Sequence, residues 1–257
     1  MASFSVLFWN IWLDNQINGP PNAAILLKEI TSIYKKYEPD YIGLNEVLQN
    51  TKSDKPFISN HLNKIGYDNI YYAPASPLND SWLIGSLAAT KLKVISNENI
   101  CLGNDIPAER RGYKGHTLKA LSLKIRIKPK DNVTIIVVHP VFLRPFTLKS
   151  HYQQTKMLDK HIRNHSNIDN LIVGGDINEP KNMPKSFAHI TKDYLTHKTG
   201  SIKQPTWSLN GKDYIPLKAN LDKIFWATNG KIKLNKFEVI DSKISDHKPI
   251  YAEFMIN

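Results

Sequence analysis

Polar residues that could bind a cation or move a proton stand next to many of the most apolar runs of this chain. They are carboxylates, amides and imidazoles, at eight positions: Asn10, Glu46, His139, Asp176, Asn178, Asp222, Asp246 and His247. Because a sheet presents the residues at its strand ends to a cleft, the repeated pattern predicts one shared site. Any one of these residues alone is more typical of a cap, a turn or a satisfied buried polar group, and it is the repetition of the pattern that favours a site.

This set of side chains suits the hydrolysis of a phosphodiester. Carboxylate oxygens are the protein ligands that Mg²⁺ prefers, and it keeps waters and substrate oxygens as further ligands. The reaction needs an activated water, stabilisation of charge on the phosphate oxygens and help for the leaving oxygen. We therefore predict a magnesium-dependent phosphodiesterase, in which Mn²⁺ can substitute because the ligands are hard oxygen donors. The sequence has no Cys/His zinc spacing, P-loop or Rossmann glycine pattern.

The apolar runs alternate between strand and helix patterns from end to end, which predicts one α/β domain over residues 1–257. We expect helices at Asn22–Tyr37, Lys55–Ile65 and Ser150–Arg163, and strands at Ser3–Leu13, Tyr41–Val47, Asn69–Ala73, Leu83–Thr90, Lys93–Ile100, Thr117–Ile127, Val133–His139, Asn170–Gly174, Leu221–Ala227 and Pro249–Met255. Strand–helix units mixed with consecutive strands favour two packed sheets with helices outside.

Composition restricts the setting of the protein. The 257 residues carry a formal net charge of +11, which favours phosphate-rich partners but also describes a lysine-rich solvated surface. Cys101 is the only cysteine, so an internal disulfide is excluded. We read the N-terminus as a first strand and not as a signal peptide, and no apolar run is long enough to insert stably into a membrane. These features predict a cytoplasmic protein, which we expect to be a monomer.

Several segments resemble, in the right order, the endonuclease/exonuclease/phosphatase superfamily with the DNase I-like fold. The segments are "VLFWNIW", "EPDYIGLNEV", "GSLAATKLKVIS", "TIIVVHP", "LIVGGDINEP", "PTWSLNG", "LDKIFWA" and "ISDHKPIYAEF", of which "GGDIN" and "SDH" are the most specific. The resemblance covers nearly the whole chain. It implies a four-layered α/β sandwich of two mixed β-sheets packed face to face with helices outside.

The resemblance also assigns roles on the metal side of the site. Glu46 is similar to the principal metal ligand of the family. Asn10 and Asp246 resemble further metal or phosphate-site residues. Asp176 resembles the group that orients or deprotonates the attacking water.

On the phosphate side, Asn178 resembles a hydrogen-bond donor to the phosphate. His247 resembles the histidine that contacts the scissile phosphate, with Asp222 as the carboxylate that orients it. His139 matches a histidine at the end of a central strand, which could protonate the leaving oxygen or hydrogen-bond the phosphate.

The chain departs from the family pattern at three places. Pro140 follows His139, where the family usually has an apolar residue, and this could re-aim the loop that carries Arg144. Asn45 precedes Glu46 where the family often has Gln, a change that leaves the metal ligand intact. The segment "SLAATK" matches the family strand only loosely.

Nucleic acid, DNA or RNA, is the substrate and partner that we predict. Arg110, Arg111 and Arg144 are candidates for backbone phosphates, and Tyr113 and Trp207 for bases. The alternative for the loop 109–116 is a solvated hairpin, and the alternative for Trp207 is core packing. Two other functions stay open: a phosphatase or phosphodiesterase acting on inositol phosphates or lipid head groups, and a non-catalytic nucleic-acid-binding member. The complete set of catalytic residues argues against the last.

Overall fold

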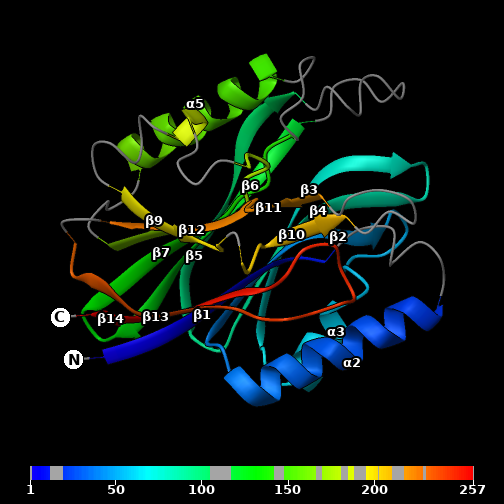
Figure 1. The fold of residues 1–257 in the computed structure, drawn as a ribbon, viewed down its shortest axis with the longest axis horizontal. Helices are drawn as coiled ribbons and strands as arrows, with labels where there is room; N and C mark the ends of the chain where they lie inside the picture. The colour runs from blue at the N-terminus through cyan, green and yellow to red at the C-terminus, as the bar shows by residue number, and fades with distance from the viewer. Residues whose placement is uncertain are drawn as a thin grey trace.

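The structure, a computed structural model, contains two six-stranded β-sheets that pack face to face (Figure 1). It describes residues 2–11, 20–104, 117–141, 148–165, 170–180, 185–187, 195–201, 203–209, 217–227 and 230–256. Within this part of the chain, no helix combines the length and the apolar character that crossing a bilayer requires.

The first sheet is built around the N-terminal strand. In spatial order its strands are β13 (Ile232–Val239), β14 (Ile250–Ile256), β1 (Ala2–Asn10), β2 (Tyr41–Asn50), β4 (Trp82–Thr90) and β3 (Asn69–Asn79). The neighbours β1 and β2 run parallel, and the other pairs are antiparallel. The helix α2 (Pro20–Tyr37) makes the crossover between β1 and β2 that a parallel pair requires.

The second sheet repeats this plan. In spatial order its strands are β5 (Lys93–Asn104), β6 (Thr117–Lys128), β7 (Asp131–Val137), β8 (Leu171–Asp176), β12 (Asp222–Ala227) and β9 (Leu195–Thr199). The neighbours β7 and β8 run parallel, with the crossover helix α5 (Leu148–His165) between them in sequence, and the other pairs are antiparallel. Both sheets are therefore mixed. A separate two-stranded ribbon pairs β10 (Trp207–Leu209) with β11 (Leu217–Ala219).

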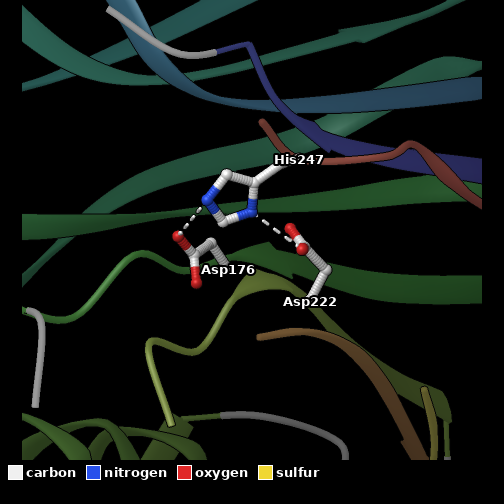
Figure 2. Close-up of side chains that lie close together, drawn as sticks. All are labelled: Asp176, Asp222 and His247. Carbon is white, nitrogen blue, oxygen red and sulfur yellow. Dashed lines mark hydrogen bonds and ion pairs between the residues drawn. The ribbon is translucent and has the colours of Figure 1, made fainter. Parts of the chain in front are cut away.

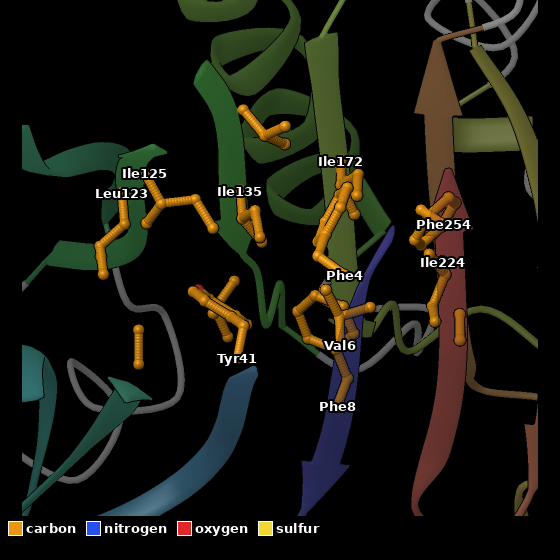
Figure 3. Close-up of a cluster of buried hydrophobic side chains, with 14 of the residues drawn as sticks. Phe4, Val6, Phe8, Tyr41, Leu123, Ile125, Ile135, Ile172, Ile224 and Phe254 are labelled. Atoms are coloured by element: carbon orange, nitrogen blue, oxygen red, sulfur yellow. The ribbon is translucent and has the colours of Figure 1, made fainter. Parts of the chain in front are cut away.

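The main core lies between the two sheets, where apolar side chains of both inner faces meet (Figure 3). Phe8 of β1 is fully buried there and lies against two glycines, Gly43 of β2 beside it and Gly174 of β8 in the facing sheet. A Cβ atom on Gly43 would lie 2.6 Å from the Phe8 ring, and one on Gly174 would lie 2.4 Å from it. Both distances are too short for real contacts, so the two sheets can approach at Phe8 only because these strand positions lack side chains.

Helices cover the outer face of each sheet and complete four layers (Figure 1). On the first sheet, Leu26 and Ile30 of α2 and Leu62 of the short helix α3 (Ser59–Lys64) share one buried cluster with strand residues. On the second sheet, Leu158 and Ile162 of α5 pack into another. The α/β sandwich that the sequence implied is confirmed.

Differences between expected and observed elements concentrate in polar segments. The sequence pattern missed the short strands β9, β10 and β11, and it missed β13, whose alternation of apolar and polar residues is interrupted at the bulge between Leu234 and Lys236. The expected helix at Lys55–Ile65 forms only as α3. β9 forms by pairing with β12, a strand well separated from it in the chain, which local sequence does not record.

Candidate active site

The site lies where the carboxyl ends of the two parallel strand pairs meet. Asn10 ends β1 and is 1 % exposed. Its side-chain amide Nδ2 donates to Glu46 Oε1 of β2 over 3.1 Å and to Asp176 Oδ2 of β8 over 3.0 Å. One buried amide group thus joins two carboxylates that belong to different sheets.

A β-bulge directs Glu46 into the site. Between Leu44 and Val47, β2 holds one residue more than the paired stretch of β4, and Glu46 takes a left-handed φ of 58°. A bulge re-aims side chains, and a left-handed backbone at a non-glycine residue costs about 1–3 kcal/mol, so the fold keeps this conformation against a local penalty. The Glu46 side chain stays 21 % exposed, with Oε1 3.7 Å from His139 Nε2.

Asp176 is the central carboxylate and is almost completely buried. Oδ1 accepts the backbone N–H of Asn178 over 2.8 Å, and Oδ2 lies 3.6 Å from Nε2 of both His139 and His247. Burial by itself raises the pKa of Asp176, but the two imidazoles and the hydrogen bonds from Asn10 and Asn178 outweigh burial and lower the pKa below its ordinary value. Asp176 is therefore a carboxylate at neutral pH.

The backbone before Asp176 is held by Asn45. The Asn45 side chain, fully buried, accepts the Asp176 N–H at Oδ1 over 3.0 Å and donates to Ser86 Oγ over 3.0 Å. Gly175 has a φ of +132°, and a Cβ there would lie 2.7 Å from Asn45 Oδ1 and 2.4 Å from the Val138 carbonyl oxygen. Glycine at this position permits the close approach, and Asn45 is a site residue in its own right.

His247 connects two buried carboxylates (Figure 2). Its Nδ1 lies 2.8 Å from Asp222 Oδ2, and its Nε2 faces Asp176. Burial alone lowers the pKa of His247, but the charges of Asp222 and Asp176 and the hydrogen bond to Asp222 outweigh it and raise the pKa to about 10. His247 is therefore an imidazolium at neutral pH, and burial raises the pKa of its partner Asp222.

The segment before β14 carries both His247 and Asp246 and is fixed at several points. Trp9 Nε1 donates to the His247 carbonyl over 3.0 Å, and Ser245 Oγ donates to the Asn10 carbonyl over 2.8 Å. Trp207 Nε1 donates to Asp246 Oδ2 over 2.8 Å. The structure thus places Trp207 at the site through its bond to Asp246, while its contact with substrate stays a prediction.

The chemistry of the donors decides which residues could hold a metal ion. Within the described residues, Asp176, Asp222 and His247 have ligand atoms within 4.8 Å of one another, so this group could bind a metal. His247 already pairs with Asp222 over 2.8 Å and faces Asp176, and an imidazole nitrogen is not the hard oxygen ligand that Mg²⁺ prefers, so this group fits an ion-paired chain better than a Mg²⁺ site.

A second donor set fits a hard cation better. The side chain of Glu46 reaches solvent, and it lies near Asp246. Burial first, and then the nearby charges of Glu46 and Asp176, raise the pKa of Asp246 against the opposing effects of His247 and Trp207. A divalent cation would relieve the repulsion between these carboxylates. Asn10 lies beside them, bonded to Glu46.

The remaining predicted residues divide into two groups. Asn178 lies beside Asp176, as expected, but its Nδ2 donates to the Pro140 carbonyl over 2.8 Å, so a phosphate contact would use the second amide hydrogen. The predicted substrate contacts Arg110, Arg111, Tyr113 and Arg144 lie outside the described residues.

Sequence reasoning missed the buried charge of Lys223. Its Nζ donates to the carbonyl oxygens of Glu179 and Asn220 over 2.6 and 2.5 Å, and the side chain is fully buried. Burial lowers its pKa to about 8, against the carboxylates Asp222, Asp176 and Glu179, which raise it. The one sequence signal is that a lysine, directly after Asp222, stands at the start of the apolar run of β12.

Solved structures of low sequence identity share this fold over its full length. An endonuclease/exonuclease/phosphatase family protein from Leptotrichia buccalis superposes with a TM-score of 0.74 at 14 % identity, over 98 % of this chain and 100 % of that one. TDP2 from D. rerio, solved with a single-strand DNA product, has a TM-score of 0.70 at 16 % identity, over 99 % and 100 %. ANGEL2, a 2′,3′-cyclic phosphatase solved with adenosine-2′,3′-vanadate, has a TM-score of 0.69 at 16 % identity, over 98 % and 95 %.

These similarities concern the fold. No protein-family model matches the chain, and no curated protein sequence matches it. The chain has the DNase I-like fold of the endonuclease/exonuclease/phosphatase superfamily, which confirms the fold that the sequence motifs implied.

Proposed function

We propose that this protein is a magnesium-dependent phosphodiesterase that hydrolyses phosphodiester bonds in nucleic acid. The observation that carries the proposal is the meeting of Glu46, Asp176 and the Asp222–His247 pair at one end of both sheets. An ionised carboxylate, a fixed imidazolium and a solvent-reachable carboxylate within a few ångströms are what in-line attack of water on phosphorus requires.

Glu46, Asn10 and Asp246 are the residues that would hold Mg²⁺. When bound, the cation would draw charge from a phosphate oxygen at this end of the site. Asn10 has a second role, because its amide group hydrogen-bonds Glu46 and Asp176 together and so sets the spacing between the two functions.

We assign a separate step of the reaction to each of Asp176, His247 and His139. Asp176 aligns the attacking water and accepts its proton, because its carboxyl is ionised at neutral pH. His247 stabilises the charge that builds on the phosphate oxygens, held in orientation by Asp222. His139, partly exposed between Glu46 and Asp176, can protonate the leaving oxygen as the P–O bond breaks.

Nucleic acid is the substrate that the observations favour. The net charge of +11 suits a polyphosphate backbone. TDP2, which shares the fold, was solved with a single-strand DNA product, and ANGEL2 with an adenosine derivative. Binding of a labelled oligonucleotide to an inactive variant should therefore weaken steeply with salt, and a flat response would count against a polyphosphate partner.

The test is hydrolysis of a substrate panel with Mg²⁺ or EDTA. The panel contains supercoiled plasmid, end-labelled single-stranded DNA and RNA, inositol phosphates, and vesicles containing sphingomyelin. Asp176→Asn is the inactive variant. Asp68→Asn is the matched control, because Asp68 is exposed and precedes β3, whose first residue pairs with Thr90 at the end of β4, four residues beyond Ser86, which bonds Asn45 of the site.

Metal-dependent cleavage of a nucleic acid by the wild type and Asp68→Asn, but not by Asp176→Asn, would support the proposal. Release of phosphate or head group from inositol phosphates or lipid alone would reassign the site to small phosphates. Binding of nucleic acid without hydrolysis of any substrate would favour a non-catalytic protein.

A further inference from the structure

The imidazole of His139 is placed in the site by its backbone. Its Nε2 lies 3.6 Å from Asp176 Oδ2 and 3.7 Å from Glu46 Oε1, and both distances exceed a normal hydrogen bond. The side chain is 23 % exposed, so packing restrains it less than a core residue. The position of His139 therefore depends on how the segment His139–Val141 is held.

This segment has left the sheet. The backbone bond from Val138 N–H to the Gly174 carbonyl, 3.0 Å long, lies just before it, and Pro140 has no N–H to donate. Pro140 and Val141 are nevertheless buried, so their backbone groups need other partners. The Pro140 carbonyl, the Val141 N–H and the Val141 carbonyl each form a hydrogen bond with a side chain.

Those three bonds come from two directions. Asn178 Nδ2 donates to the Pro140 carbonyl over 2.8 Å. From α5, Gln154 Oε1 accepts the Val141 N–H over 2.9 Å, and His151 Nδ1 donates to the Val141 carbonyl over 2.7 Å. Both backbone groups of Val141 are thus held by one helix.

The two α5 residues that hold Val141 are buried at a cost. His151 and Gln154 are 0 % and 2 % exposed, three residues apart and so on the same face of the helix. A buried amide or imidazole destabilises the fold unless it is hydrogen-bonded. The other crossover helix, α2, avoids this cost. From Ala23 onwards, the residues that it buries are the apolar Leu26, Ile30 and Ile33.

His151 also ties α5 to the segment that follows Asp176. Because the Val141 carbonyl can only accept, Nδ1 carries a proton, and the other ring nitrogen, Nε2, lies 3.1 Å from Ser186 Oγ. The Ser186 hydroxyl also lies 2.6 Å from Glu179 Oε2, so its single hydrogen serves either His151 Nε2 or this carboxylate, while the Ser186 N–H donates to Glu179 Oε2 over 3.2 Å. The helix thus holds the segment after β7 and the segment after β8 in one buried network.

We infer that His151 and Gln154 are positioning residues, which set the imidazole of His139 against Glu46 and Asp176 by fixing both backbone groups of Val141. The catalytic consequence rests on the proposed function. The geometric part, that α5 determines the place of His139, stands on the hydrogen bonds alone.

A matched pair of neighbouring glutamines provides the test. Gln154→Met removes the acceptor for the Val141 N–H at nearly constant volume. Gln153→Met makes the same change at the next, exposed position of α5. With an oligonucleotide substrate, whose leaving alkoxide needs a proton, and Mg²⁺, we expect kcat of Gln154→Met to fall about tenfold or more with KM within about twofold, because a displaced catalytic group slows the chemical step. Gln153→Met should keep the wild-type values.

Two substitutions of His151 separate positioning from packing. An Asn amide can occupy the place of Nδ1 and a Gln amide the place of Nε2. We expect His151→Asn to keep most of the activity, because it keeps a donor for the Val141 carbonyl. His151→Gln keeps the contact with Ser186 but loses the hydrogen bond to the Val141 carbonyl, so it should behave like Gln154→Met. Equal losses in both variants would show that only packing matters and would overturn the inference.

Two readouts are independent of turnover. Hydrogen exchange of the Val141 amide should accelerate about tenfold or more in Gln154→Met, because its acceptor is lost. The His139 ring resonances, followed by NMR at constant pH, should shift in this variant and stay fixed in Gln153→Met. A thermal melt confirms that each variant is folded.

The outcomes distinguish the inference from the proposed function. If the wild type cleaves no substrate, the proposed function fails, and the Val141 exchange and His139 resonances still decide whether α5 positions His139. Unchanged exchange and resonances in Gln154→Met would overturn the inference. Faster exchange with unchanged His139 resonances would also overturn it, because Val141 would then be held without effect on the place of His139.

Discussion

The two ends of the candidate site differ in their access to water. At one end, the side chains of Glu46 and His139 are 21 % and 23 % exposed. At the other, those of Asp222 and His247 are 1 % and 7 % exposed. Asp176 lies between them, with 2 % of its side chain exposed.

The two ends balance charge in different ways. At the buried end, Asp222 and His247 neutralise each other over 2.8 Å, since an unpaired charge would be costly there. At the exposed end, Glu46 lies near further carboxylates, whose negative charge water can screen or a cation can neutralise. The backbone of Glu46 is also strained, with its φ in the left-handed region. The comparison indicates that the buried end is a permanent part of the fold, and it supports the exposed end as the place for the cation that we propose.

The largest expected effect is at Asp176, where the two ends meet. Asp176→Asn keeps the shape of the side chain and removes its negative charge. We expect kcat to fall about a thousandfold, because both alignment of water and proton acceptance are lost. Steady-state kinetics with the preferred substrate measure this, with Asp68→Asn as the control. Turnover within tenfold of wild type would remove Asp176 from the reaction.

The next effect contrasts the stability of the two ends. Asp222→Ala leaves His247 without its hydrogen-bonded carboxylate, and we expect it to lower the free energy of unfolding by about 3–5 kcal/mol. Glu46→Ala removes a partly exposed carboxylate, and we expect a change within about 1 kcal/mol. Urea unfolding at neutral pH measures both. Equal losses would show that the two ends are equally part of the folded framework.

The third effect concerns the cation. Glu46→Gln should weaken Mg²⁺ binding by about 10- to 100-fold, by analogy with the loss on altering residues around a metal site. Titration calorimetry with Mg²⁺, and the Mg²⁺ concentration for half-maximal turnover, measure this change. Asp222→Asn should leave both values unchanged. A larger loss of affinity in Asp222→Asn than in Glu46→Gln would place the metal in the Asp176–Asp222–His247 group instead.

The smallest effect is a shift with pH. The pKa of His247, about 10, exceeds its ordinary value of 6.5. Its charge therefore stabilises the fold fully below pH 6.5, and this stabilisation is lost as the pH rises through about 10. Asp222→Asn removes the negative charge that raises the pKa of His247 against its burial, so this pKa should fall. The basic limb of the pH–activity profile should then move to lower pH. NMR titration of the His247 ring checks the direction, and an unmoved pKa would contradict the role of Asp222.

Much of the fold was readable from the sequence because its signals are local. Apolar runs with strand or helix periodicity, ended by Gly, Pro or a polar residue, set out the central strands and α2 and α5. The polar ends of those strands were visible for the same reason, so Asn10, Glu46, Asp176, Asp222 and His247 could be named in advance. The edge strand β9 and the ribbon β10–β11 lack such signals and were missed.

The tertiary structure alone decided how these residues meet. The bulge that turns Glu46 inward is a mismatch between β2 and β4, and the contact of Asp222 with His247 joins residues 25 positions apart. The bond from Lys223 to Glu179, the bond from Trp207 to Asp246 and the bonds from α5 to Val141 depend likewise on residues outside the same strand or turn. Sequence by itself determined which side chains stand at strand ends, because periodicity and turn residues act over a few positions. Distances, burial and pKa values arise only when separate strands pack, because they are properties of the space between strands.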